Sequence, residues 1–163
     1  MIQTRIPPPV YALCVAALMW LGDQYAPAIR WIAPPWNEFG WILIALGLAL
    51  DLYSILIFIR TRTTVNPLRP GNATQLVVSG VYRISRNPMY LGLVLSLTGW
   101  AWLLGSPLCL LLVLLFARVL VIVQIAPEEI ALRDRFGTSY GDYSKQVNRW
   151  IGRKSRSNKP PAE

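Results

Sequence analysis

Four stretches of mostly apolar residues divide the chain. A helix needs about 20 apolar residues to cross a bilayer, and residues 39–59 (FGWILIALGLALDLYSILIFI) meet that length. Residues 9–25, 89–104 and 108–126 are somewhat shorter, and the first of them carries Asp23 near its end. We therefore expect an all-α integral membrane protein with four transmembrane helices, in a single membrane domain that spans residues 1–163.

The first stretch has a second interpretation as a signal peptide. Arg5 precedes it, and Ala26-Pro27-Ala28 follows it like a small-residue cleavage site. A single leading arginine and a proline between the alanines are weak versions of that signal, so a retained helix is the expectation. At the other end we expect residues 153–163 to be disordered.

Basic residues gather in two segments outside the apolar stretches. Residues 60–88 hold five arginines and residues 127–163 hold eight lysines and arginines, whereas residues 105–107 hold none. Because cytoplasmic loops carry the excess of Lys and Arg, both segments and both termini should face the cytoplasm. The net charge of +8 then reflects topology and contact with anionic lipid headgroups, and we expect no nucleic-acid partner.

Composition narrows the possible chemistry. Only 15% of the residues are charged, against roughly 25% in average soluble domains, which agrees with a membrane protein. There is no histidine, and the two cysteines, Cys14 and Cys109, lie inside apolar stretches. We expect no metal site, and a reaction would depend on Asp, Glu, Arg, Lys, Tyr, Asn or backbone groups.

The third and fourth stretches are joined only by Gly105, Ser106 and Pro107. At about 1.5 Å of rise per residue, both arms of such a helical hairpin return to the same face of the membrane. Residues 86–90 (RNPMY) should therefore meet residues 126–129 (APEE) at the cytoplasmic interface.

Each of these two segments also has a purely structural interpretation. Asn87 and Pro88 suit the cap and first position of a helix. Pro127, Glu128 and Glu129 suit the first turn of a new helix. Together, however, carboxylates, an aromatic side chain and exposed backbone donors are what a nucleoside-bearing cation would require.

The chain after Glu129 has an amphipathic helical pattern. Gly137 and Gly141 interrupt it, so we expect two short helices at the interface. They could be a simple surface element or a lid over the site. The pattern is carried by Leu132, Phe136, Tyr140, Tyr143, Val147 and Ile151.

Two ionisable residues lie inside apolar stretches, Asp51 in the second and Arg118 in the fourth. Such residues are costly in a membrane and indicate function or a partner. Either they pair with each other, or they form a polar wall of a substrate cavity.

The segments SGVYRISRNPMYLG and APEEIALRDRFGTSYGDYSKQVNRW resemble the isoprenylcysteine carboxyl methyltransferase family, with its bacterial relatives and the phospholipid methyltransferases. The family pattern is approximately Gly-x-Tyr-Arg-x-x-Arg-His-Pro-x-Tyr-x-Gly, then Glu-Glu-x-x-Leu, then Phe-Gly-x-x-Tyr-x-x-Tyr. The match covers residues 76–151. It implies a membrane enzyme, in the bacterial inner membrane, that uses S-adenosylmethionine at the cytoplasmic end of the hairpin.

The resemblance also assigns site residues. The segment after Tyr140 would close the site, and Glu129 with Glu128 would contact the polar end of the cofactor. As a hypothesis about the mechanism, an arginine such as Arg86 or Arg149 would hold a carboxylate acceptor, and Glu128 or Glu129 would be the base for an amine or phenol acceptor. The remaining implied cofactor-binding residues are Tyr82, Arg83, Asn87, Pro88, Tyr90, Leu91 and Gly92.

Two positions depart from the family pattern. Asn87 stands where the family usually has histidine, and Gln146 stands where eukaryotic members have an arginine thought to engage the substrate carboxylate. We expect methyl transfer to a lipophilic acceptor, with carboxyl methylation favoured. The alternatives are a phospholipid N-methyltransferase and a non-catalytic membrane scaffold; the sequence gives no oligomeric state.

Overall fold

The computed structural model describes residues 6–25, 30–61 and 75–153. Over these ranges every named element is helical, which confirms the predicted all-helical fold class. The predicted cleavage-site residues 26–28 and most of the predicted tail, residues 154–163, lie outside the described ranges. The elements are α1 (Pro8–Tyr25), η1 (Trp36–Phe39), α2 (Gly40–Arg60), η3 (Gly80–Arg83), α3 (Pro88–Leu104), α4 (Pro107–Leu120), η4 (Val121–Ile125) and α5 (Ala126–Gln146).

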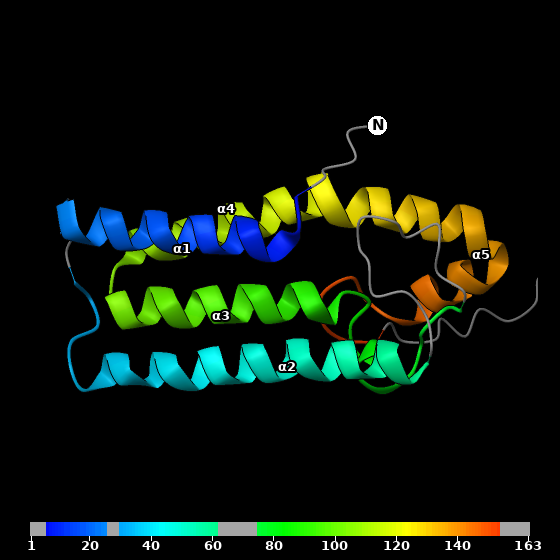
Figure 1. The fold of residues 1–163 in the computed structure, drawn as a ribbon, viewed down its shortest axis with the longest axis horizontal. Coiled ribbons are helices and arrows are strands. Elements are labelled where there is room, and N and C mark those ends of the chain that lie inside the picture. Colours follow the sequence, from blue (N-terminus) through cyan, green and yellow to red (C-terminus); the bar gives the residue numbers. More distant parts are fainter. Residues whose placement is uncertain (1–5, 26–29, 62–74, 154–163) are drawn as a thin grey trace, which may run out of the picture.

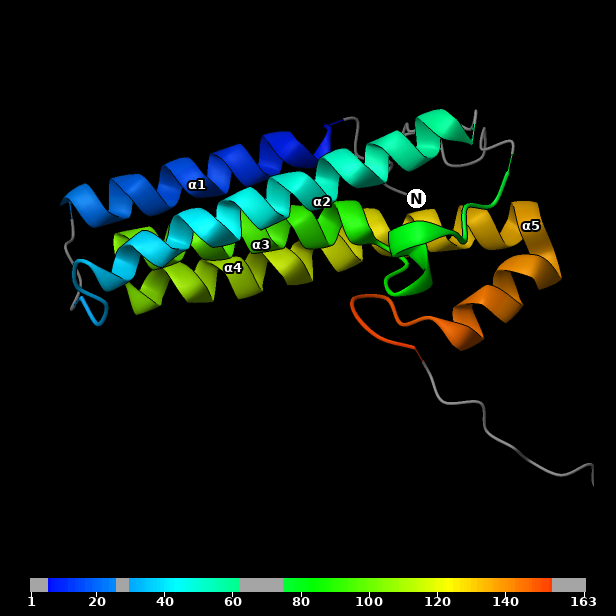
Figure 2. The same ribbon diagram turned by 90° about the horizontal axis from the view of Figure 1, so that it is seen from below.

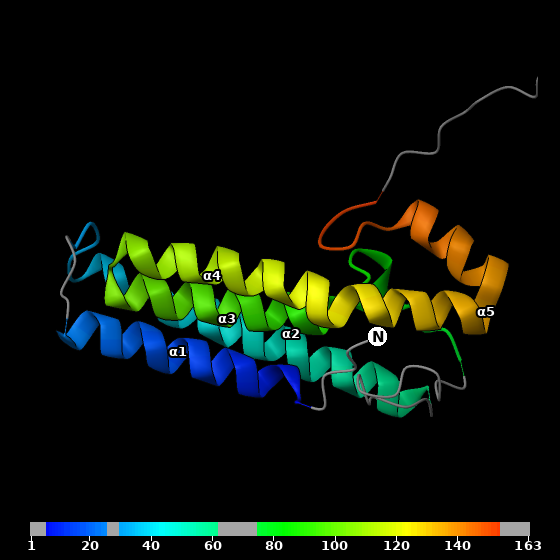
Figure 3. The same ribbon diagram turned by 90° about the horizontal axis from the view of Figure 1, so that it is seen from above.

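Helices α1 to α4 run side by side along the long axis of the molecule (Figure 1). Helix α3 packs against α2 on one side and against α1 and α4 on the other. Helix α5 continues α4 beyond the end of this bundle and then turns back, as Figure 2 shows from below and Figure 3 from above. Helix α5 therefore lies at one end of the four-helix bundle.

Two helices of the described chain are long and apolar enough to cross a membrane. They are Trp36–Arg60 and Pro107–Gln146, and α3 is a shorter apolar helix. Most of the apolar stretch in each of the two is exposed on the outside of the bundle. An exposed apolar surface of this extent is typical of contact with lipid, as in a membrane protein. The four-span topology stays a prediction.

Glycines allow α2 and α3 to approach closely. Gly40 faces Gly99, and Gly47 faces Gly92. The two glycines of each helix are seven residues apart, and the pairs match because the two helices are antiparallel. A β-carbon on Gly47 would lie 2.6 Å from the carbonyl oxygen of Gly92, and one on Gly99 would lie 2.5 Å from that of Gly40. Small residues at a helix interface bring the backbones into contact, the usual mode of packing in membranes.

Gly105 and Ser106 connect α3 to α4 at the end of the bundle opposite to α5. Gly105 has a φ of 66°, and a β-carbon there would lie 2.5 Å from the carbonyl oxygen of Ile32. Its own carbonyl oxygen accepts a hydrogen bond of 3.0 Å from the amide of Trp31. Only glycine fits both this backbone conformation and this close approach.

Pro127, Glu128 and Glu129 lie in the first turn of α5, but no break separates α5 from the helix before it. Helices α4, η4 and α5 form one continuous helix, and residues Ile125 and Ala126 keep right-handed helical dihedral angles. The turn Val121–Ile125 is a π-helix. Its displaced hydrogen-bond register lets the chain continue past a proline that has no amide donor.

Gly137 breaks α5, as predicted, but Gly141 does not. Gly137 has φ 51° and ψ −122°, whereas Gly141 lies within the regular helix. The break turns residues 138–146 back towards the start of α3 (Figure 2). Helix α5 thus consists of two helical arms, joined at a single glycine.

Candidate functional site

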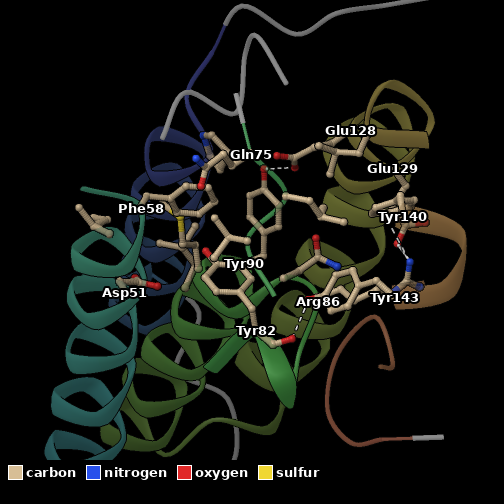
Figure 4. Close-up of a pocket in the computed structure, with 18 of the residues that line it drawn as sticks. Asp51, Phe58, Gln75, Tyr82, Arg86, Tyr90, Glu128, Glu129, Tyr140 and Tyr143 are labelled. Carbon is tan, nitrogen blue, oxygen red and sulfur yellow. Dashed lines mark hydrogen bonds and ion pairs between the residues drawn. The ribbon is translucent and has the colours of Figure 1, made fainter. Parts of the chain in front are cut away.

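The start of α3 and the start of α5 meet at the α5 end of the bundle (Figure 4). Tyr90, in the first turn of α3, is only 6% exposed. Its hydroxyl donates a hydrogen bond of 2.9 Å to Oε2 of Glu128. The two segments that the sequence analysis expected to converge are therefore in direct contact.

Glu129 is held by two arginines from different parts of the chain. Nε of Arg149 donates to Oε1 at 3.0 Å and Nη2 donates to Oε2 at 2.7 Å, which makes a bidentate pair. Nη1 of Arg86 lies 3.1 Å from Oε1 of the same carboxylate. The side chains of Arg86 and Glu129 are 11% and 17% exposed, so this charged cluster is largely shielded from water and its bonds are of the strong, charge-assisted kind.

The returning arm of α5 adds two tyrosines. Nη1 of Arg86 donates to the hydroxyl of Tyr140 at 3.1 Å, and Tyr140 is 2% exposed. The hydroxyl of Tyr143 donates to the carbonyl oxygen of Tyr82 at 2.7 Å. Because Gly137 reverses the chain, an aromatic cover lies over the segment that precedes α3.

Residues 147–153, which we call the C-terminal strap, bind the segment before α3 through the backbone. The amide of Arg86 donates to the carbonyl oxygen of Asn148 at 3.1 Å, and the amide of Gly152 donates to that of Ile84 at 2.8 Å. Val147 and Arg153 form a bridge that folds the strap on itself. These bonds place the guanidinium of Arg149 beside Glu129.

Asn87 occupies the N-cap position of α3, and Pro88 follows in the first turn. The predicted side-chain cap is wrong, because the side chain of Asn87 makes no cap hydrogen bond. Its Nδ2 donates instead to the carbonyl oxygen of Arg149 at 3.0 Å. The residue that replaces the family's histidine thus fixes the strap rather than the helix.

These side chains surround a pocket of about 180 Å³. Helices α1, α2, α3 and α5 and the segment before α3 all contribute to its wall (Figure 4). The wall is mainly apolar, with carboxylates, tyrosines and one arginine set into it. Among the predicted site residues, those that line the pocket are Tyr82, Arg86, Asn87, Tyr90, Glu128, Glu129 and Tyr140.

The other predicted site residues lie elsewhere. Arg83 is exposed on η3, and Arg149 reaches Glu129 from the strap. Pro88, Leu91 and Gly92 belong to α3 outside the pocket wall.

Sequence reasoning missed Phe58 and Gln75 as lining residues. A signal was available for the first, because Asp51, Ile55 and Phe58 recur at steps of four and three and share one face of α2. Gln75 follows residues 62–74, which lie outside the described part of the chain, and no periodic pattern marks it.

Asp51 and Arg118 do not pair. Arg118 is exposed on the outside of α4, and no ion pair among the described residues includes either side chain. Asp51 instead lines the pocket, which is the second of the two alternatives that the sequence left open.

Two groups outside the helical spans, Tyr82 and Arg149, have pKa values shifted upwards. Burial raises the pKa of the Tyr82 hydroxyl above its usual range, and the negative charge of Glu128 raises it further. The hydrogen bonds to Glu129 raise the pKa of Arg149. Tyr82 is therefore a neutral hydrogen-bonding group and Arg149 a permanent cation at neutral pH.

Comparison with known proteins finds relatives in a bacterium and in plants. A protein of Haemophilus influenzae described as uncharacterized is 43% identical over 63 residues, which cover 39% of this chain and all of that protein. Protein-S-isoprenylcysteine O-methyltransferase B of Arabidopsis thaliana is 26% identical over 140 residues, 83% of this chain and 69% of the plant protein. A probable protein-S-isoprenylcysteine O-methyltransferase of Oryza sativa subsp. indica is 27% identical over 109 residues, 67% of this chain and 57% of its own length.

No solved structure matches the chain. The profile of the phospholipid methyltransferase family matches residues 36–144, from η1 to the second arm of α5. That range is most of the chain and holds nearly the whole pocket wall. The chain therefore belongs to the phospholipid methyltransferase family.

Proposed function

We propose that this protein is a membrane methyltransferase that binds S-adenosylmethionine in the pocket at the junction of α3 and α5. The observation that carries the proposal is the hydrogen bond between Tyr90 and Glu128. It lies beside the cluster in which Arg86 binds Glu129 and Tyr140. The family and the names of the relatives support methyl transfer. In this proposal the chain crosses the bilayer four times, α3 and α4 form the hairpin, and both termini face the cytoplasm of a bacterial inner membrane.

The residues present fit the chemical groups of this cofactor. Nε of Arg86 is buried without a hydrogen-bond partner in the described structure, so it is a donor available to a carboxylate. Glu128 accepts a hydrogen bond from Tyr90 and keeps lone pairs for a ribose hydroxyl or an ammonium group. The rings of Phe58 and Tyr82, 5.3 Å apart edge to face, offer an aromatic surface to a base.

The bound cofactor would supply an electrophilic methyl group. The role of the chain is then to orient that group, fix the surrounding charges and exclude water. Tyr90 fixes the orientation of Glu128, and the two arginines fix that of Glu129. The second arm of α5 and the strap form the lid that the sequence analysis weighed, held closed by Tyr143 and Arg149.

Two acceptor classes follow from the relatives and the family. The names of the plant relatives favour carboxyl methylation, as the sequence analysis did, and the family description favours a phospholipid amine. Arg86 and Arg149 both bind Glu129, and Nε of Arg86, a buried donor without a partner in the described structure, binds the carboxylate of the cofactor in this proposal. The charges of the pocket therefore support the amine more strongly.

Isothermal titration calorimetry with S-adenosylhomocysteine, the product form of the cofactor, tests the proposal. We expect micromolar binding to the purified protein and a loss of at least tenfold in affinity for Glu128→Gln. Asp142→Asn is the matched control, because Asp142 lies on the same helix and pairs with Lys145 at the surface. A well-folded wild-type protein without measurable binding would support the non-catalytic scaffold instead.

A further inference from the structure

Asp51 is a carboxylate in the middle of α2 that faces the pocket. It shares one helical face with Ile55 and Phe58, and all three line the wall. In Figure 4 its side chain comes from α2, on the other side of the pocket from Glu128 and Glu129. The pocket thus has a second polar pole, separate from the cluster proposed to bind the cofactor.

Gly92 of α3 makes room for this side chain. A β-carbon on Gly92 would collide with the carboxylate of Asp51 and would also lie 2.7 Å from the carbonyl oxygen of Gly47. Any larger residue at position 92 would displace the carboxylate from its position between the two helices. The close packing of α2 on α3 therefore also fixes where Asp51 lies.

The described structure provides no cation for Asp51. Its Oδ1 is buried without a hydrogen-bond partner, and Arg118 points out of the bundle. The one arginine in the pocket wall, Arg86, is bound to Glu129. A carboxylate oxygen without a hydrogen-bond partner inside an apolar span is costly, so a functional role for Asp51 is expected.

We infer that Asp51 binds the amino group of the methyl acceptor and selects an amine-headed lipid over a carboxylate. This inference rests on the proposed function and assigns to Asp51, a residue outside the cofactor cluster, the choice between the two acceptor classes. The described pocket wall holds the carboxylates of Asp51, Glu128 and Glu129 and the guanidinium of Arg86, and Arg149 binds Glu129 from behind the wall. Both arginines are thus engaged by Glu129, and the carboxylates of Asp51 and Glu128 have no cation beside them among the described residues. An ammonium group would be attracted to this wall and a carboxylate repelled by it.

In the proposed step, Asp51 accepts the proton that the amine must lose before methyl transfer. The acceptor enters as R–NH3+ and gives one proton to the carboxylate of Asp51, which leaves the nitrogen lone pair free. The nitrogen then forms a bond to the methyl carbon of the sulfonium while the carbon–sulfur bond breaks, and that electron pair stays on sulfur. The products are R–NH2–CH3+, a neutral thioether and a protonated Asp51, which later releases its proton to water.

The test compares the wild-type protein with Asp51→Asn and Asp51→Glu in detergent. Each is incubated with methyl-labelled cofactor and vesicles that contain phosphatidylethanolamine and a prenylated cysteine. Base treatment releases label from methyl esters and leaves it on methylated amines. Arg118→Gln is the matched control, because it alters the other ionisable residue of the spans outside the pocket.

We expect base-stable label in the phospholipid fraction of the wild type and at least a tenfold decrease for Asp51→Asn. Arg118→Gln should equal the wild type. Affinity for S-adenosylhomocysteine should stay within about twofold in all variants, since among the described residues no hydrogen bond or ion pair joins Asp51 to Glu128, Glu129 or Arg86. Base-labile label as the main wild-type product, or full activity of Asp51→Asn, would overturn the inference.

A binding measurement supplies a readout other than activity. With S-adenosylhomocysteine present, a long-chain amine should bind the wild type at least tenfold more tightly than the matching alcohol. Asp51→Asn should lose this preference and Asp51→Glu should keep part of it. Equal binding of amine and alcohol to the wild type would overturn the role of Asp51. Absence of S-adenosylhomocysteine binding by the wild type would instead overturn the proposed function itself.

Discussion

The hydroxyl of Tyr90 donates to Glu128 across 38 positions of sequence, at 2.9 Å. This bond connects the first turn of α3 to the first turn of α5. It therefore holds the carboxylate of Glu128 in one orientation. Tyr90→Phe removes the bond and leaves the ring. A hydrogen bond to a charged group is worth about 1.5–3 kcal/mol, so we expect about a 10- to 100-fold loss of S-adenosylhomocysteine affinity by calorimetry.

The control for that change is Tyr25→Phe, which removes a hydroxyl from a side chain that is 85% exposed. Its affinity should match the wild type. Equal affinities for Tyr90→Phe and Tyr25→Phe would show that the orientation of Glu128 does not depend on Tyr90.

The bidentate pair between Arg149 and Glu129 should hold the C-terminal strap on the segment before α3. Arg149→Lys keeps the charge but cannot make both parallel hydrogen bonds. We expect severalfold faster hydrogen exchange at the amides of Arg86 and Gly152, which close the strap onto its neighbour. Lys145→Arg, in an exposed pair with Asp142, should leave those amides unchanged.

Much of the site could be predicted because its determinants are local. The short connection between α3 and α4 and the charges at residues 128 and 129 are visible in the sequence, and they were enough to place Tyr90 beside Glu128. The role of Asn87 could not be predicted in this way. Its partner is the carbonyl oxygen of Arg149, 62 positions away, and no local preference distinguishes that bond from a helix cap.

Two other features could not be predicted for the same reason. The continuity of α4 into α5 depends on a π-turn before Pro127, and a proline after an apolar stretch is equally typical of a helix start. The contact of Asp51 with Gly92 depends on how α2 crosses α3. Hydropathy locates both helices but contains no information about which faces meet.

The break in α5 provides a matched pair of glycine substitutions. Gly137 has a positive φ of 51°, whereas Gly141 is helical, and a β-carbon added at either position would meet no atom within 4 Å. Gly137→Ala should destabilise the returning arm by about 1–2 kcal/mol through backbone strain. Gly141→Ala should be neutral or stabilise by up to about 1 kcal/mol.

Thermal unfolding and cofactor binding should separate these two variants. Gly137→Ala should lower both the unfolding temperature and the affinity for S-adenosylhomocysteine, because Tyr140 would lose its contact with Arg86. If Gly137→Ala and Gly141→Ala behaved alike, the reversal of the chain at Gly137 would not be needed to form the site.

The close packing of α2 on α3 should be the most sensitive part of the bundle. Gly99→Ala would place a β-carbon 2.5 Å from the carbonyl oxygen of Gly40, a backbone atom that cannot move aside alone. Overpacking of this kind costs about 1–3 kcal/mol, and the helices would have to separate along their length. We therefore expect a lower unfolding temperature in detergent and, because Asp51 depends on the same packing, weaker binding of the long-chain amine. Gly22→Ala, on α1 with open space around its β-carbon, should change neither quantity; an equal effect of the two substitutions would contradict the glycine contact as the basis of this packing.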